Sequence, residues 1–183
     1  MHADERTPGR VAVFDYGGAI ATAIVRFKYA GRSDLAARFA AVMSSSVDMS
    51  AECIDLVVPV PLHARRLAER GFDQAALLAA PVARRLRVRH APRALVRVRE
   101  TPPQASLDRP ARIANVEGAF VCPAPAKIDG ARILLVDDVR TTGATLTACE
   151  RALRRAGATA VTTLVLASRD RSRNVKKPGQ YED

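Results

Sequence analysis

The amino-acid sequence predicts an α/β protein in which helices flank a mostly parallel central sheet. The segment IDLVVPV, residues 54–60, is a continuous apolar run bounded by prolines, which is typical of a strand buried on both faces. Strand-like segments also alternate with helical patterns along the chain, as they do in parallel sheets. The length of 183 residues, with 48% hydrophobic and 26% charged residues, fits one globular domain with its own core.

Helical patterns fill most of the first half of the chain. Apolar residues recur at helical spacing over residues 17–29, which predicts the first helix. Residues 33–43 predict a second helix, with Ser33 as its N-cap. Residues 73–86 predict a third helix, which Pro81 is expected to end or kink because proline lacks the backbone N–H.

Strands and one further helix are predicted in the second half. Strand patterns cover residues 94–100, 116–122, 131–136 and 160–168. Residues 144–156 predict a helix that ends at Gly157. The stretch 101–114 lacks a clean period and contains prolines near both ends, so we expect a long, flexible loop that acts as a lid.

The domain limits and the cell compartment follow from composition. We expect a single domain over residues 1–183, with a core at about 14–168 and flexible ends at 1–10 and 169–183. The three cysteines form no CxxC pair, which argues against a zinc ribbon or a disulfide framework in this chain. No apolar run reaches the roughly 20 residues of a membrane span, and the first residues contain no signal-peptide core. The expected location is the cytoplasm, without membrane insertion.

The charge balance favours polyanionic partners. The formal net charge is +10, from 29 basic and 19 acidic residues, and most of the basic residues are arginines. Such an excess suits phosphate groups, whether on a metabolite or on nucleic acid. Aromatic residues make up only 4% of the chain, which weakens the case for a surface that stacks single-stranded bases. The net charge therefore does not decide between a small phosphate-bearing metabolite and DNA as the partner.

The most informative stretch is RILLVDDVRTTGATL, residues 132–146. It predicts a strand, a loop that holds two adjacent carboxylates, and a helix entry rich in threonine and glycine. Free N–H groups and the positive dipole end of a helix favour a bound phosphate at such an entry. Two carboxylates beside a phosphate site suit a sugar phosphate such as ribose 5-phosphate. An ordinary helix cap would explain one Asp or Thr, but it would not explain the whole stretch.

This stretch resembles the phosphoribosyl-pyrophosphate (PRPP) binding motif of type I phosphoribosyltransferases. Three further segments are similar to the ComF, or competence protein F, family: FKYAGR, VVPVPLHARRLAERGFDQ and LVRVRETPPQASLDRPARIANVEGAF. The similarity runs from about Phe14 to Ala167. The resemblance implies the type I phosphoribosyltransferase fold, with a mostly parallel sheet, flanking helices and a flexible lid loop.

The resemblance also implies roles for individual residues. Asp137 and Asp138 would be the catalytic residues that hold the ribose 2- and 3-hydroxyls, and they would reach Mg²⁺ through those hydroxyls or through water. The 5-phosphate would be bound by Val139, Arg140, Thr141, Thr142, Gly143, Ala144 and Thr145. Pyrophosphate would be bound by Val60, Pro61, Arg65, Arg66, Arg97, Arg99 and Lys28. The lid would contain Thr101, Gln104 and Arg112.

The implied activity is displacement of pyrophosphate from C1 of PRPP by an unidentified acceptor, with Mg²⁺ as cofactor. The alternative is a non-catalytic PRPP-binding sensor or a component of competence and DNA uptake, with single-stranded DNA or the competence machinery as candidate partners. A generic nucleic-acid binder that shares only the fold is a third and weaker hypothesis. Proteins with this fold commonly dimerise, so a homodimer is a further candidate.

The sequence departs from the family pattern in three respects. Family members often begin with a cysteine-rich zinc-binding segment, and we expect none in this chain. Arg140 stands where the family usually has an aromatic or aliphatic residue, which adds a positive charge beside the expected phosphate site. Asp73 replaces the asparagine usual in RGFNQ, so an amide donor is lost there.

Overall fold

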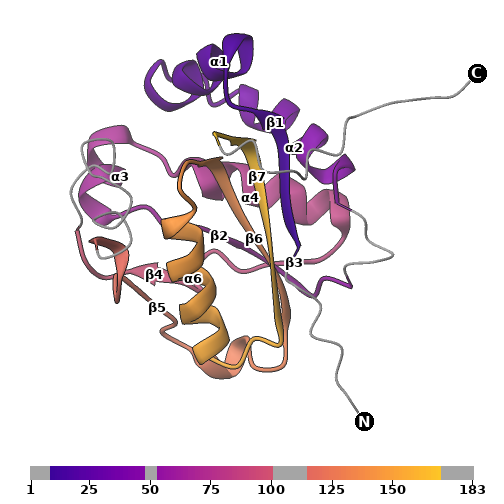
Figure 1. Cartoon of the computed structure of the whole chain (residues 1–183), viewed down its shortest axis with the longest axis vertical. Helices are drawn as coiled ribbons and strands as arrows, with labels where there is room; N and C mark the ends of the chain where they lie inside the picture. The colour runs from indigo at the N-terminus through magenta and orange to yellow at the C-terminus, as the bar shows by residue number, and fades with distance from the viewer. Residues whose placement is uncertain (1–8, 48–52, 101–114, 170–183) are drawn as a thin grey trace, which may run out of the picture.

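One five-stranded parallel sheet forms the centre of the molecule, with the strand order β1-β7-β6-β2-β3 (Figure 1). The protein is represented by a computed structural model that describes residues 9–47, 53–100 and 115–169. The strands are β1 (Arg10–Asp15), β2 (Leu56–Pro59), β3 (Arg89–His90), β6 (Arg132–Arg140) and β7 (Ala160–Ser168). Every pairing in this sheet is parallel, so the prediction of an α/β fold with a mostly parallel sheet is confirmed.

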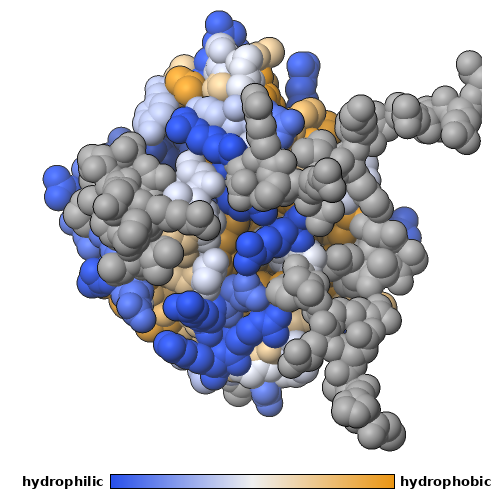
Figure 2. All heavy atoms as spheres, in the orientation of Figure 1, coloured by the Kyte–Doolittle hydropathy of each residue, from blue (hydrophilic) through white to orange (hydrophobic). Residues whose placement is uncertain are grey.

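Helices cover both faces of the sheet. One face carries α1 (Gly18–Tyr29), α2 (Leu35–Ser45) and α4 (Gln74–Leu86). The other carries α6 (Ala144–Arg155), packed beside a small antiparallel pair of β4 (Val96–Arg97) and β5 (Phe120–Val121). The remaining elements are α3 (Ala64–Arg70) and the 3-10 helix η2 (Pro125–Lys127). Hydrophilic side chains gather over the outer face of α6 (Figure 2). In the part of the chain that the structure describes, no helix has the length and apolar character needed to cross a membrane.

Strand β6 shows why the central strands are continuously apolar. Ile133 and Leu135 pack with the cluster under α6, whereas Leu134 and Val136 pack with the cluster under α1, α2 and α4. All four side chains are at most 1% exposed, because successive residues of a strand point to opposite faces and both faces are covered here.

Strand β6 continues beyond its predicted end at residue 136. It runs to Arg140, which pairs with Ser168 at the end of β7. The first half of the predicted loop at 137–144 is therefore strand, because the long β7 supplies backbone partners that local sequence patterns do not reveal. The acidic residues consequently lie on a strand rather than in a loop.

The predicted strands at 94–100 and 116–122 are wrong in extent and in placement. Only the two-residue strands β4 and β5 form there, and they pair with each other outside the central sheet. Asn115 and Val116 are helical instead. The central sheet is completed by the edge strands β1, of six residues, and β3, of two residues, which were not predicted. Helix α3 was not predicted either.

Two details of the helices also differ from prediction. Helix α4 runs unbroken through Pro81 to Leu86. Its buried side chains, which include Leu78 and Val82, hold the helix against the sheet and offset the hydrogen bond lost at proline. Ser33 is not the cap of α2, which Asp34 precedes without a capping hydrogen bond from its side chain.

The structure describes the ends of the chain in part and does not describe the segment predicted as a lid. The predicted lid at 101–114, with Thr101, Gln104 and Arg112, lies outside the described residues, as do residues 1–8 and 170–183. Arg10 already belongs to β1, so the sheet begins before the predicted core start at residue 14. The backbone N–H of Arg169 donates to the carbonyl of Arg140, which ties the end of β7 to β6.

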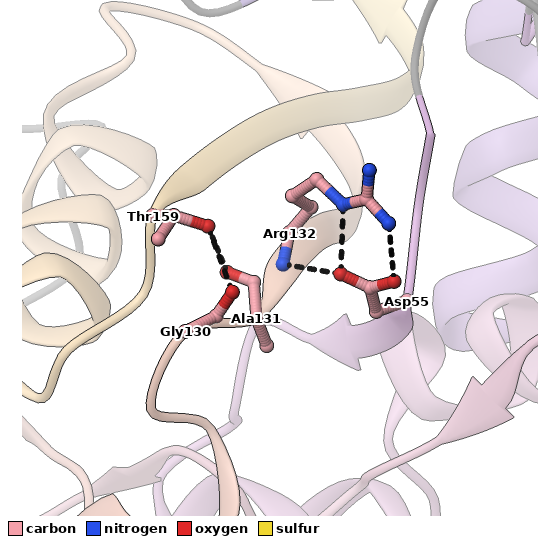
Figure 3. Close-up of polar contacts among 5 residues, drawn as sticks. All are labelled: Asp55, Gly130, Ala131, Arg132 and Thr159. Atoms are coloured by element: carbon pink, nitrogen blue, oxygen red, sulfur yellow. Dashed lines mark hydrogen bonds and ion pairs between the residues drawn. The ribbon is translucent and has the colours of Figure 1, made fainter.

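Polar contacts join the strands at the edge where β2, β6 and β7 begin (Figure 3). The Asp55 carboxylate accepts from the backbone N–H of Arg132 and, at 2.9 and 2.7 Å, from its Nε and Nη2. These bonds lower the pKa of Asp55 to about 2. Thr159 Oγ1 donates toward the carbonyls of Gly130 and Ala131, at 2.9 and 3.2 Å. This edge is the one opposite the acidic residues of β6.

Gly157, in the turn between α6 and β7, lies close to Asp129. A substitution at Gly157 therefore reports how tightly this edge of the sheet is packed. Its φ of +99° disfavours other residues, and a Cβ there would lie 2.2 Å from Oδ1 and 3.2 Å from Cα of Asp129. We expect Gly157→Ala to lower the free energy of unfolding by about 2 kcal/mol, measured by urea denaturation. The backbone strain of a positive φ and the steric overlap of the new Cβ with Asp129 both contribute. Gly130→Ala is the matched control, since its φ of +72° meets open space and the expected cost is about 1 kcal/mol. Equal losses in the two variants would contradict the packing argument.

Candidate functional site

Asp137 and Asp138, the acid pair, lie near the carboxyl end of β6 and point toward different neighbours. Oδ1 of Asp137 accepts the backbone N–H of Asp138 at 2.8 Å. The Asp137 side chain is partly buried and lies within electrostatic reach of Arg97 and Cys149, on the α6 side of the sheet. Asp138 is 6% exposed and faces α1. The two carboxylates are therefore held separately, although they are adjacent in sequence.

Asp138 forms an ion pair with Lys28, at the end of α1. The distance from Nζ of Lys28 to Oδ2 of Asp138 is 2.7 Å, and the two side chains are 21% and 8% exposed. The sequence predicted Lys28 as a pyrophosphate-binding residue, and the structure places its ammonium group on the acid pair. This contact ties the first helix to the functional end of the sheet.

The environment of Asp137 disfavours a negative charge. Burial, followed by the neighbouring charge of Asp138, raises the pKa of the Asp137 carboxyl from 3.8 to about 8, although Lys28 acts in the opposite direction. A carboxyl group placed where its charge is costly lowers the stability of the folded state at neutral pH. Such positions are characteristic of functional sites rather than of packing.

The raised pKa predicts a stability change with a defined sign. Because the folded state binds the Asp137 proton more tightly than the unfolded state does, its stabilising contribution is present at low pH and is lost as pH rises toward about 8. We expect Asp137→Asn to be more stable than wild type at pH 8 by roughly 2 kcal/mol, with little difference near pH 4, in urea unfolding. Asp15→Asn removes an exposed carboxylate as a control. A difference that did not vary with pH would contradict this assignment.

A threonine–glycine turn, Thr141–Gly143, links β6 to α6. Gly143 has a φ of +77° and stands at the N-cap of α6, where it provides no capping side chain. The Oγ1 of Thr142 accepts the backbone N–H of Ala144 at 3.5 Å. The first turn of α6 contains no acidic residue, so the positive end of the helix is not neutralised from within it. The turn thus presents N–H groups and hydroxyls beside the acid pair.

The other residues predicted for the 5-phosphate surround this turn. Val139 is in β6 and packs against the apolar core, whereas Ala144 and Thr145 begin α6. The Nε of Arg140 donates to Oγ of Ser168 at 3.0 Å. Its side-chain carbons lie 3.8 Å from the position that a Cβ on Gly143 would take, so Arg140 packs along the turn.

The segment after β2, predicted to bind pyrophosphate, is held by Asp73. The N–H of Val60 donates to the carbonyl of Val136, and Pro61 follows at the end of the strand. Oδ2 of Asp73 accepts the N–H of Leu62 at 3.1 Å, while its Oδ1 accepts the N–H of Ala76 and caps α4. An asparagine amide would offer one acceptor oxygen, so the carboxylate at this position supports both contacts.

His63 has a local structural role in this segment. It is the N-cap of α3, and its Nδ1 accepts the backbone N–H of Arg65 at 3.3 Å. The Arg65 side chain forms ion pairs with Glu69 and Glu100, at 3.1 and 3.3 Å. Arg65 therefore already interacts with two carboxylates.

Arg97 and Arg99, also predicted to bind pyrophosphate, lie in different environments. Nη2 of Arg99 donates to the carbonyls of Asn115 and Glu117, at 3.1 and 2.6 Å. Arg97 instead packs over the ring of Phe120, at 5.4 Å. Burial lowers the pKa of Arg97, the charge of Arg66 lowers it further, and Asp137 acts in the opposite direction. The two arginines differ because β4 ends at Arg97, so Arg99 lies beyond the strand.

The sequence did not reveal how the acid pair is supported. The Lys28–Asp138 ion pair and the double acceptor role of Asp73 join segments distant in sequence. The one available signal in the sequence was that Lys28 and Asp73 stand in segments that match the family pattern. Carboxylate oxygens are ligands that Mg²⁺ prefers, and within the described ranges no cluster of three or more His, Cys, Asp or Glu residues could hold a metal ion alone. A Mg²⁺ ion at this site would therefore need ligand oxygens in addition to those of the acid pair.

Comparison with known proteins identifies the class to which this fold and site belong. The phosphoribosyl transferase domain family matches residues 73–182. In solved structures, glutamine phosphoribosylpyrophosphate amidotransferase from B. subtilis is similar, with a TM-score of 0.51 and 18% identity, over 76% of this chain and 30% of that chain. The chain is thus a type I phosphoribosyltransferase-fold protein.

Two curated relatives define the family more narrowly. The DNA utilization protein YhgH of Salmonella typhi is 34% identical over 156 residues, which are 82% of this chain and 68% of the relative. Competence protein F of Haemophilus influenzae is 35% identical over 104 residues, which are 56% of this chain and 45% of the relative. The chain belongs to the ComF family within the phosphoribosyltransferase superfamily.

Proposed function

We propose that the protein binds PRPP with Mg²⁺ and transfers its phosphoribosyl group to an acceptor, with release of pyrophosphate. The observation that carries the proposal is the position of the acid pair, near the end of β6 and two residues before the threonine–glycine turn. Ligands of open α/β sheets bind at the carboxyl ends of the strands, where this pair lies.

Each part of PRPP has a complementary group at this end of the sheet. The threonine–glycine turn and the start of α6 would bind the 5-phosphate through N–H groups and hydroxyls. Asp137, the more exposed member of the acid pair, would accept from a ribose hydroxyl, while Asp138 is held in place by Lys28. Arg97 and Arg66, within electrostatic reach of each other, would bind pyrophosphate.

The reaction would depend on positioning and electrostatics. The bond from C1 to the pyrophosphate oxygen breaks as the acceptor bond forms, and the sugar acquires oxocarbenium character. Bound Mg²⁺ would neutralise charge on the departing pyrophosphate. The chain's own contribution is to hold the ribose at the acid pair and to present guanidinium groups to the leaving group.

A second candidate function is PRPP binding without turnover, in a protein that handles DNA. The relatives named DNA utilization protein and competence protein F favour it. The net charge of +10 and the exposed Arg151, Arg154 and Arg155 on α6 suit a polyanion as well.

Two measurements on the same preparation distinguish these functions. PRPP and Mg²⁺ should raise the Tm if the site binds PRPP. Release of pyrophosphate with a panel of bases and amines should follow if the protein is a transferase. A Tm increase without release on any acceptor would favour the binding protein, whereas the absence of both responses would reject the two proposals together. Salt-dependent DNA binding, measured in parallel, would test the role in DNA handling.

A further inference from the structure

A pocket of about 490 Å³ opens between the end of α1 and helix α3, next to the acid pair. It is lined chiefly by Lys28, Tyr29, Arg66, Glu69, Arg70 and Phe72. Lys28 also forms the ion pair with Asp138, so one side chain of the pocket lining contacts the acid pair. This volume lies within the range of small-molecule sites. We call it the α1–α3 pocket.

Arg70 is held in a fixed position at this pocket. Its guanidinium carbon lies 4.9 Å from the centre of the Tyr29 ring. Nη2 donates to the Tyr29 hydroxyl at 3.3 Å, and Nη1 donates to Oε1 of Gln74, which is only 4% exposed. A guanidinium carries five N–H donors, so donors remain for a ligand after these two contacts. Preorganisation of this kind lowers the cost of binding an anion.

The charges and rings of the pocket favour a particular ligand chemistry. Glu69 is the single carboxylate in the lining, and its Oε1 is paired with Arg65 at 3.1 Å. The one acidic member of the lining is therefore already in an ion pair outside the pocket cations, and Arg70 keeps N–H donors for a ligand. Tyr29, 71% exposed, and Phe72 add ring surface beside these cations. A flat ring that carries an acidic group complements both features, whereas a phosphate chain would use only the cations.

We propose that the α1–α3 pocket is the acceptor site and that it selects a planar, ring-containing acceptor with a carboxylate. This inference rests on the proposed phosphoribosyl transfer. The carboxylate binds Arg70, and the ring lies along Tyr29 and Phe72, while Arg66 stays with the pyrophosphate. Lys28, with two ammonium N–H groups beyond its contact with Asp138, connects the acceptor to the ribose.

The chemical step is balanced without a further reagent. A nucleophilic nitrogen of the acceptor supplies the electron pair for the new bond to C1 of the ribose. The bond from C1 to pyrophosphate breaks, and its electron pair leaves on the pyrophosphate oxygen. A nitrogen that carries a proton, as in orotate or anthranilate, releases it to water, whereas the ring nitrogen of nicotinate carries none and becomes a pyridinium. The carboxylate of the acceptor takes no part in bond making and serves only for recognition.

Matched pairs of ring compounds test the proposal by calorimetry on the full chain. Orotate, nicotinate and anthranilate are compared with uracil, nicotinamide and aniline, which have the related rings without the carboxylate. We expect at least one acid to bind about tenfold or more tightly than its neutral partner, and Arg70→Gln to remove that preference. Arg85→Gln, at the exposed end of α4 and outside the pocket, should retain it.

PRPP binding with Mg²⁺, measured on the same variants, separates this inference from the proposed function. Normal PRPP binding by wild type with no carboxylate preference in any pair would overturn the inference alone. The same conclusion would follow if Arg70→Gln weakened pyrophosphate binding but left the acids unaffected, because the pocket would then hold the leaving group. Failure of wild type to bind PRPP would overturn both. Loss of carboxylate preference in Arg70→Gln with PRPP binding retained would support the acceptor site.

Discussion

The double variant Asp137→Asn/Asp138→Asn is expected to lose its stabilisation by PRPP and Mg²⁺. In wild type, ligand at about 100 times its Kd should add roughly 2.7 kcal/mol to the free energy of unfolding. For a domain of this size, that energy corresponds to a Tm increase of about 5–10 °C. The variant keeps the side-chain shapes but replaces both carboxyl groups by amides, so the proposed contacts to the ribose hydroxyls and to Mg²⁺ weaken together.

The comparison must be made against each protein's own baseline, because Asp137→Asn is itself expected to change stability. Thermal unfolding of each protein with and without PRPP and Mg²⁺ provides this difference. Asp15→Asn/Asp129→Asn removes two exposed carboxylates and should leave the response to ligand unchanged. A full ligand-induced increase in the acid-pair variant would show that PRPP does not depend on these residues. The proposed function would then lose the observation that carries it.

Lys28→Met is expected to lower the free energy of unfolding by about 3 kcal/mol, because it leaves the carboxylate of Asp138 buried without its cation. The Asp138 side chain is 8% exposed, and Nζ of Lys28 lies 2.7 Å from its Oδ2. Methionine keeps the length and the apolar part of the lysine side chain, so the loss reports mainly the missing charge. Urea unfolding of wild type and variant measures the effect.

A second substitution distinguishes an ion-pair effect from a packing effect. Lys28→Met/Asp138→Asn should recover most of the lost stability, because the carboxylate that lacked a partner is then gone. Lys127→Met, at an exposed position, is the control for removal of a lysine and should change stability little. If the double variant were as unstable as Lys28→Met, the cost would come from packing at the end of α1. The ion pair would then not be the link between α1 and β6.

Much of the fold could be predicted because its signals are local. Continuous burial on both faces of β6 and β7 requires apolar runs, and these runs are visible in the sequence. The helices over 18–29, 74–86 and 144–155 show apolar residues at helical spacing. The edge strand β3 was missed because two residues are too few to show a pattern, whereas β1 contains the apolar run VAVF and was visible in the sequence. The end of β6 was misplaced because its last residues depend on pairing with β7.

The candidate site also combines features that the sequence reveals with features that depend on the tertiary structure. The sequence by itself determined which chemical groups stand at the end of β6: two carboxylates, then threonines and a glycine before a helix. Only the tertiary structure decided how they are used. It separated Asp137 from Asp138, paired Asp138 with Lys28 and brought α1 beside α3 to form a pocket. The physical reason is that ion pairs and pockets arise between segments distant in the chain, whereas hydrophobic periodicity and helix-entry chemistry are properties of neighbouring residues.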